Sequence, residues 1–275
     1  MKLSVQLFAV MLLVSLLPYS LASIEVITTT LYRPESCLDI KQLRPKVHLN
    51  GYYTIYDKEE ALHTVYCDFN SEKPYVWTLI ESFSRKMGMY RSEEKGHYHF
   101  QRPFTTDYAY SECRPDNFQA YRTSLAARRL IYGSQTTTHW RATCNFDLYA
   151  MGIDKKMSHR DYVRGSMCSL NIMTLGSSGG SCYYADYMNI HGHSCSHCSM
   201  PFYASGSTHL SLISSQSPNR CGRIRFGHTV KNEYNWGTYV NYNEKFRCTA
   251  TPESTTNWWL GGVYNAQDLQ QNVKK

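Results

Sequence analysis

One ten-residue segment, HGHSCSHCSM, places three histidines and two cysteines within eight positions. Cys195 and Cys198 have the Cys-x-x-Cys spacing of half a zinc site, in which the ligand atoms lie about 2.0–2.3 Å from the metal. His191 or His193 would supply further ligands, because an extended strand places both on the same face as Cys195. The alternative is that the cysteines are oxidised to disulfides and are not available as thiolates. The compartment in which the protein folds therefore decides between the two chemistries.

The beginning of the chain predicts an oxidising compartment. Lys2 supplies the positive charge of a signal peptide, Leu7 to Leu17 is an almost unbroken apolar run, and Ala22 is a small residue of the type that signal peptidase requires. The apolar run is too short to span a bilayer comfortably. We therefore expect a secreted, extracellular protein that is cleaved after Ala22 and has no transmembrane segment.

All ten cysteines lie beyond the expected signal peptide. An even number of cysteines in an oxidising compartment predicts up to five disulfides, although counting alone assigns none of the pairs. For the cysteine–histidine segment we therefore expect disulfides with histidines beside them. A metal site at His191, His193, Cys195 and Cys198 is the less favoured alternative, and no cofactor is expected.

A glycine- and serine-rich segment, GSSGG, matches the Gly-x-Ser-x-Gly motif of hydrolases with Ser178 as the nucleophile. That motif requires a strand before it and a helix after it, within alternating β and α units. The chain lacks this alternation, and a loop rich in glycine and serine needs no catalysis to explain it. We therefore expect no enzyme.

The charge of the chain favours anionic partners. There are 29 Lys+Arg against 22 Asp+Glu, and loss of the signal peptide would remove Lys2 alone and leave 28 basic residues. Outside the cell, this moderate excess indicates anionic glycans or extracellular matrix components as partners, rather than nucleic acid. In the segment RIRF, Arg223 and Arg225 would share one strand face that could bind glycans, the alternative being a solvated face.

Short strands and two helices are expected to position these residues. CLDIKQL predicts a short helix that Pro45 ends, and YYTIY, LHTVYCDF and YVWTLIESF predict three strands. Residues 117–132 predict a helix with Asn117 as its N-cap and Gly133 just past its end. Beyond residue 133 the pattern is of short strands between turns, which the 23 tyrosines of the chain suit.

Four groups of residues in the first third of the mature chain follow one another in a distinctive order. They are Cys37, Asp39 and Ile40; Gly51, Tyr53 and Ile55; Val65, Cys67 and Asp68; and Trp77, Thr78, Leu79 and Ile80.

This series resembles the start of a fibrinogen C-terminal-like domain. The resemblance implies a disulfide between Cys37 and Cys67. In the same family a disulfide with twelve intervening residues flanks the ligand pocket, and Cys182 and Cys195 have that spacing. The chain has no Asp-x-Asp, so the calcium site and the acetyl-group pocket of lectin-type relatives are not carried over.

The sequence therefore predicts a disulfide-stabilised α+β protein with a fibrinogen-like N-terminal subdomain and a mostly β or irregular C-terminal part. Its expected parts are a signal peptide (1–22), a leader (23–36), the fibrinogen-like subdomain (37–110) and a cysteine-rich C-terminal part (111–275).

Invertebrate secreted proteins with segments of this kind serve in innate recognition, adhesion or the organic matrix of mineral skeletons. By that resemblance we expect a non-catalytic extracellular matrix or binding protein, a mineralised skeletal matrix included. The alternatives are a lectin-like glycan-recognition protein and, less favoured, a zinc-binding or serine-hydrolase enzyme. The sequence leaves the oligomeric state open.

Overall fold

The computed structural model describes residues 33–88, 100, 102–153, 161–175, 178–205, 209–212, 221, 234–237 and 243–265. The chain divides into two units, Met1–Tyr32 and Arg33–Lys275, and the fold described below belongs to the second. The expected signal peptide, Arg223 and Arg225 lie outside the described residues, whereas all ten cysteines lie within them.

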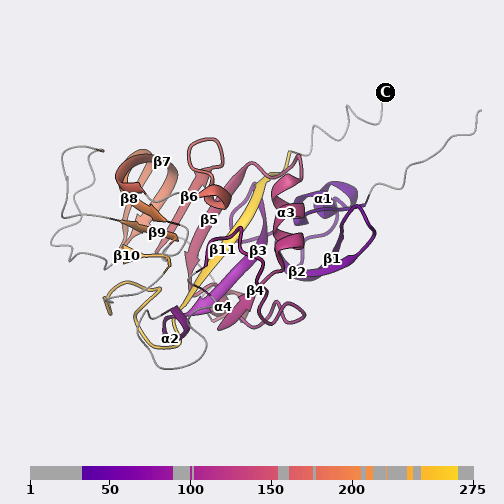
Figure 1. The fold of residues 1–275 in the computed structure, drawn as a ribbon, viewed down its shortest axis with the longest axis horizontal. Helices are drawn as coiled ribbons and strands as arrows, with labels where there is room; N and C mark the ends of the chain where they lie inside the picture. Colours follow the sequence, from indigo (N-terminus) through magenta and orange to yellow (C-terminus); the bar gives the residue numbers. More distant parts are fainter. Residues whose placement is uncertain are drawn as a thin grey trace, which may run out of the picture. The chain divides into compact units, whose positions relative to one another are not determined.

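The eleven described strands form one sheet in which all the pairs are antiparallel (Figure 1). Its order is β1-β2-β3-β11-β5-β6-β7-β8-β9-β10, and β4 pairs with β3. The strands are β1 Gly51–Tyr56, β2 Leu62–Asp68, β3 Tyr75–Ser84, β4 Ala120–Arg122, β5 His139–Cys144, β6 Tyr162–Ser166, β7 Ser178–Ile190, β8 His193–Ser205, β9 His209–Leu212, β10 Tyr234–Asn235 and β11 Thr255–Val263.

The strand β11 lies between β3 and β5, so distant parts of the chain meet at the centre of the sheet (Figure 1). Residues before and after position 110 therefore share one sheet. The described helices are few and short: α1 Cys37–Leu43, α2 Arg85–Gly88, α3 Leu125–Gly133, α4 Phe146–Ala150 and the 3₁₀ turn η3 Ile172–Thr174. The fold is thus mostly antiparallel β-sheet with a few short helices.

The helix expected over residues 117–132 is shorter than predicted. Residues Ala120–Arg122 form β4 instead, because the side chains of Tyr121 and Arg122 are completely buried against the sheet. The helix α3 then begins after Ser124, whose side chain accepts a hydrogen bond from the backbone N–H of Ala127. Burial of two large side chains outweighs the local helix signal here.

The central strands are buried because both faces of the sheet are covered. α1 and α3 pack on the face that carries the larger hydrophobic cluster, and α4 contributes Phe146 to a smaller cluster on the other face. In the smaller cluster, the guanidinium of Arg141 lies 4.7 Å from the ring centre of Trp77 and 4.5 Å from that of Trp259. Its charge is paired with Asp68 at 2.6 Å, as a buried ion requires.

A β-bulge in β3 changes which face receives its side chains. Trp259 pairs with Leu79, whereas Trp258 pairs with Glu81, so Ile80 is the extra residue. Leu79 and Trp259 belong to the smaller cluster, and Ile80 and Trp258 to the larger one. Glu81 therefore lies on the same face as Trp258, where an unbroken alternation would have turned it to the opposite face.

The described part of the chain contains four disulfides. They are Cys37–Cys67, Cys144–Cys248, Cys182–Cys221 and Cys195–Cys198, and Cys113 and Cys168 are free, so the maximum of five disulfides is not reached. The first of these is the pair that the fibrinogen-like resemblance implies.

The expected pairing of Cys182 with Cys195 is wrong. Cys182 lies opposite Pro201 in the β7–β8 hairpin, and Cys195 lies opposite Met188. Six residues of strand separate Cys182 from Met188, which corresponds to about 20 Å. Two cysteines more than about 7 Å apart at Cα cannot form a disulfide.

Candidate functional site

The cysteine–histidine segment forms the turn and the start of the β7–β8 hairpin. His191 and Gly192 have positive φ values of 51° and 81° and make the turn, so His191 does not continue the strand that begins at His193. Cys195 and Cys198 are bonded to each other, so neither sulfur is a thiolate. Within the described part of the chain, no group of three or more His, Cys, Asp or Glu residues is placed to hold a metal ion.

The hydrolase motif is not formed at Ser178. This residue begins the strand β7, and the residues after it continue the strand to Ile190. A nucleophile elbow requires a helix at that point. The segment before it contains the 3₁₀ turn η3 in place of the strand that the motif needs. The described residues around Ser178 therefore do not form a nucleophile elbow.

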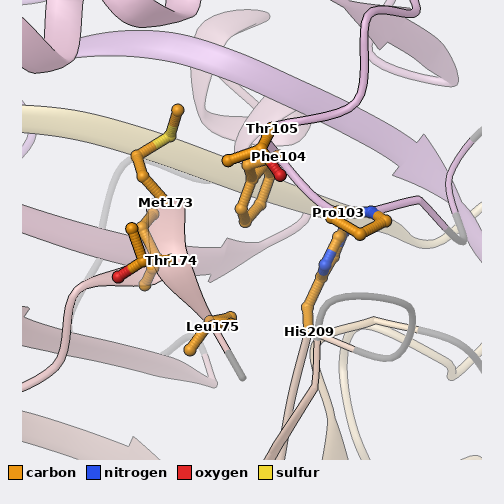
Figure 2. Close-up of a pocket in the computed structure, with 8 residues that line it drawn as sticks. Pro103, Phe104, Thr105, Met173, Thr174, Leu175 and His209 are labelled. Carbon is orange, nitrogen blue, oxygen red and sulfur yellow. The ribbon is translucent and has the colours of Figure 1, made fainter. Parts of the chain in front are cut away.

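A cavity of about 350 Å³ lies between the loop that precedes β4, the 3₁₀ turn η3 and the start of β9 (Figure 2). This volume lies within the range of about 300–1,000 Å³ that is typical of sites for small ligands. Its walls combine buried side chains, three of them apolar (Phe104, Ile172 and Met173), with the exposed side chains of Thr105 and Thr174. The lining residues are Pro103, Phe104, Thr105, Ile172, Met173, Thr174, Leu175 and His209.

Two buried arginines fix the loop that carries Phe104 and Thr105. Arg122 comes from β4 and Arg128 from α3, and both side chains are fully buried. A guanidinium has five donors in a rigid fork, so one arginine can hold several backbone carbonyls at once. The loop carbonyls that accept these bonds are those of Arg102 and Pro103 for Arg122, and those of Phe104, Thr106 and Tyr108 for Arg128.

The buried carboxylate of Glu81 joins this arginine pair to the cavity. Glu81 forms an ion pair with Arg122 and lies 2.9 Å from Nε2 of His209. Burial would raise the pKa of Glu81, but the charge of Arg122 and the hydrogen bond from His209 outweigh burial and lower it. Burial and the charge of Arg122 lower the pKa of Arg128 to about 9, so Arg128 is still charged at neutral pH.

His209 is held in one orientation by its surroundings. Its ring stacks on Phe104 with centroids 4.3 Å apart and an interplanar angle of 12°. The residue has a φ of 52°, a left-handed conformation that residues other than glycine adopt at a cost. Such strain persists only where the surrounding structure over-determines it, and it is common at ligand sites.

The contact with Glu81 shows which ring nitrogen of His209 donates. An ionised Glu81 can only accept, so Nε2 carries a proton and donates it to the carboxylate. The Nδ1 atom is buried and has no hydrogen-bond partner among the described residues. The arrangement therefore places an imidazole, hydrogen-bonded to a carboxylate, in the cavity wall.

One residue in the sequence could have indicated this site. Glu81 is a charged residue in the otherwise apolar and hydroxyl-bearing strand YVWTLIESF. A buried acid requires a partner, but its partners are 41 and 128 positions away in the chain. Only the sheet topology brings Arg122 and His209 to it.

No family model matches the chain, and no curated protein is significantly similar to it. The likeness to fibrinogen C-terminal-like domains thus stands on the residue pattern from Cys37 to Ile80.

Proposed function

We propose that the chain is a secreted, non-catalytic binding protein of the extracellular matrix, which holds a small, largely apolar group of its partner in the cavity described above. The cavity is the observation that carries this proposal. Its walls at Phe104, Ile172 and Met173 are each less than 5% exposed, so they are fixed parts of the core and suit an apolar group. Thr105 and Thr174 are exposed at the same cavity, so their hydroxyl groups can form hydrogen bonds with polar atoms of the partner.

An extracellular location is supported by the cysteine chemistry. Eight of the ten cysteines form disulfides, which are typical of proteins that fold in an oxidising compartment. The expected signal peptide agrees with this location. Among the described helices, none is long and apolar enough to cross a membrane. The net charge of +7 at pH 7 favours anionic matrix components as partners.

The surroundings of His209 support binding rather than catalysis. A general base must come within hydrogen-bond distance of the proton that it removes. His209 is 0% exposed, Phe104 covers one face of its ring, and its Nδ1 atom is closed to solvent. The described part of the chain shows no hydroxyl or thiol that is hydrogen-bonded to this imidazole. Its role in the proposal is to fix the cavity wall.

A second candidate is lectin-like recognition of a glycan. The exposed hydroxyls of Thr105 and Thr174, next to apolar walls, favour it, because sugars present both hydroxyl groups and apolar C–H faces. Competition by free sugar separates the two candidates.

The test measures retention of the protein on immobilised matrix polypeptides and glycans. Thr105→Arg should reduce saturable binding at least tenfold, because the larger charged side chain obstructs the cavity. Thr54→Arg is the matched control, since Thr54 is an exposed threonine of β1 outside the cavity. Equal binding by both variants, or no saturable binding by the wild type, would contradict the proposal. Competition by free sugar would identify the glycan candidate.

A further inference from the structure

The four disulfides differ in how far they are shielded from solvent. Cys37, Cys67, Cys144 and Cys248 are each 0% exposed, and the Cys182–Cys221 disulfide joins an exposed Cys182 to Cys221, which is 3% exposed. Cys195 and Cys198, by contrast, are only half-buried on the β7–β8 hairpin. The same chain carries two exposed free thiols, Cys113 and Cys168. The protein therefore holds both reactants of a thiol–disulfide exchange on its surface.

We propose that copies of this protein link covalently when a free thiol of one copy attacks the Cys195–Cys198 disulfide of another. The thiolate of Cys113 or Cys168 forms a bond to one of the two sulfurs, and the bond between those sulfurs breaks. The electron pair goes to the sulfur that leaves, which takes up the proton lost by the attacking thiol. One disulfide and one thiol are consumed, and one of each is formed, so no oxidant is needed.

The Cys195–Cys198 disulfide can open without disrupting the fold. It closes a loop with only two residues between its cysteines, whereas Cys144–Cys248 joins positions 104 apart and constrains the unfolded chain far more. Backbone pairing also continues past both cysteines, with Cys195 opposite Met188 and Cys198 opposite Ala185. The hairpin therefore keeps its ladder when the sulfur bridge is exchanged.

The sheet keeps Cys113 away from the disulfide of its own copy. Cys113 lies in the loop between β4 and Tyr110, which itself pairs with Arg122 of β4. β4 pairs with β3, and β8 is five strand positions from β3. Neighbouring strands are about 4.8 Å apart, so the span is about 24 Å.

Cys168 is nearer to its own disulfide but still too far to bond with it. It follows the end of β6, two strand positions or about 10 Å from β8. A disulfide needs the Cα atoms within about 7 Å of each other. Exchange therefore occurs between copies.

Two thiols and the partly exposed Cys195–Cys198 disulfide allow the linkage to propagate. Each copy can attack two others and can be attacked at its own disulfide, and each attack releases a new thiol. The total number of free thiols stays at two per chain, which distinguishes exchange from oxidation of thiols to new disulfides. This inference goes beyond the ligand cavity and does not depend on it, so each can fail without the other.

The experiment uses the full secreted chain at pH 8 in oxygen-free, metal-free buffer, with equal amounts of ¹⁴N- and ¹⁵N-labelled protein. After N-ethylmaleimide has blocked all thiols, non-reducing electrophoresis and mass spectrometry identify the linked peptides. We expect mixed-isotope links from Cys113 or Cys168 to Cys195 or Cys198, with two thiols per chain throughout. Absence of covalent oligomers, links within one copy only, or links among Cys113 and Cys168 alone would overturn the proposal.

Matched variants locate the two reactants. The double variant Cys195→Ser/Cys198→Ser should abolish linkage although both free thiols remain. Cys113→Ser/Cys168→Ser should abolish it although the disulfide remains. Wild-type protein whose free thiols are alkylated before mixing provides the same test without a substitution. Undiminished linkage in any of these three samples would overturn the proposal.

Discussion

The Nε2 atom of His209 lies 2.9 Å from Oε1 of Glu81, although the two residues are 128 positions apart in the chain. The other carboxylate oxygen of Glu81 accepts a hydrogen bond from Arg122. One buried carboxylate therefore connects β3, β4 and β9, and with them the loop and the strand that border the cavity. The side chains of Glu81, Arg122 and His209 are all 0% exposed, so water cannot replace a hydrogen-bond partner that one of them loses.

Substitution of Glu81 by Gln should strongly destabilise the protein. The amide leaves Arg122 buried without its counter-charge, which typically lowers the free energy of unfolding by about 3–5 kcal/mol. Glu60→Gln is the control, because Glu60 pairs with Arg33 but its side chain is 69% exposed. An exposed pair contributes less than about 1 kcal/mol. Urea unfolding of the two variants measures both values, and a similar loss in both would contradict the role of the buried ion pair.

The contribution of Glu81 to stability should disappear in acid. Its pKa in the folded protein lies below the ordinary value of 4.5, so the unfolded chain binds the proton more tightly. The stabilisation is complete above pH 4.5 and is lost as the pH falls through the lower, folded-state pKa. The difference in free energy of unfolding between wild type and Glu81→Gln should therefore narrow from pH 6 to pH 3. A constant difference across this range would show that the charge of Glu81 is not responsible.

Substitution of Arg128 by Met should loosen the loop that borders the cavity. Four backbone carbonyls, those of Phe104, Thr106, Tyr108 and Thr123, lose a charged donor. We expect a loss of about 3 kcal/mol in the free energy of unfolding.

Hydrogen exchange should also become faster in residues 102–108 of the Arg128→Met variant than elsewhere in the sheet. Arg129→Met is the matched control, because the neighbouring Arg129 is exposed and its change should stay within about 0.5 kcal/mol. Equal exchange rates in the two variants would exclude the proposed role of Arg128.

Substitution of Gly261 by Ala should disrupt the centre of the sheet. A Cβ atom at this position of β11 would overlap the backbone carbonyl oxygen of Val76 and meet the side chain of Trp77 at 2.8 Å. Because a backbone atom cannot move aside as a side chain can, we expect a loss at or above the about 1–3 kcal/mol of ordinary overpacking. Thermal unfolding of Gly133→Ala gives the comparison, since no atom lies within 4 Å of a Cβ there. Equal melting temperatures for the two variants would contradict the close strand packing.

Local signals in the sequence predicted local structure. The strands expected over YYTIY and LHTVYCDF are confirmed as β1 and β2, and the helix over CLDIKQL is confirmed as α1. The N-cap of α3 is Ser124, seven residues after the predicted cap Asn117, because the burial of Tyr121 and Arg122 depends on their pairing with Ser82 and Glu81 of the distant strand β3.

The candidate site could not be predicted because its parts meet only through the sheet. The cavity joins residues 103–105, 172–175 and His209, and no spacing rule relates these segments. The bulge at Ile80, which turns Glu81 to the cavity side, forms where β3 meets β11, so it depends on a pairing between distant parts of the chain. For the cysteine–histidine segment, the even number of cysteines predicted that Cys195 and Cys198 are oxidised. Which cysteine each one bonds to depends on the register of the β7–β8 hairpin.

The position of β11 has a consequence for biosynthesis. Its residues, Thr255–Val263, leave the ribosome after those of every other described strand, yet they occupy the middle of the sheet. Until they arrive, β3 and β5 each present an unpaired edge, and neighbouring nascent chains can pair with it. An incomplete sheet therefore needs shielding until synthesis has passed residue 263, and a chain released before residue 255 is expected to be a substrate for chaperones and proteases.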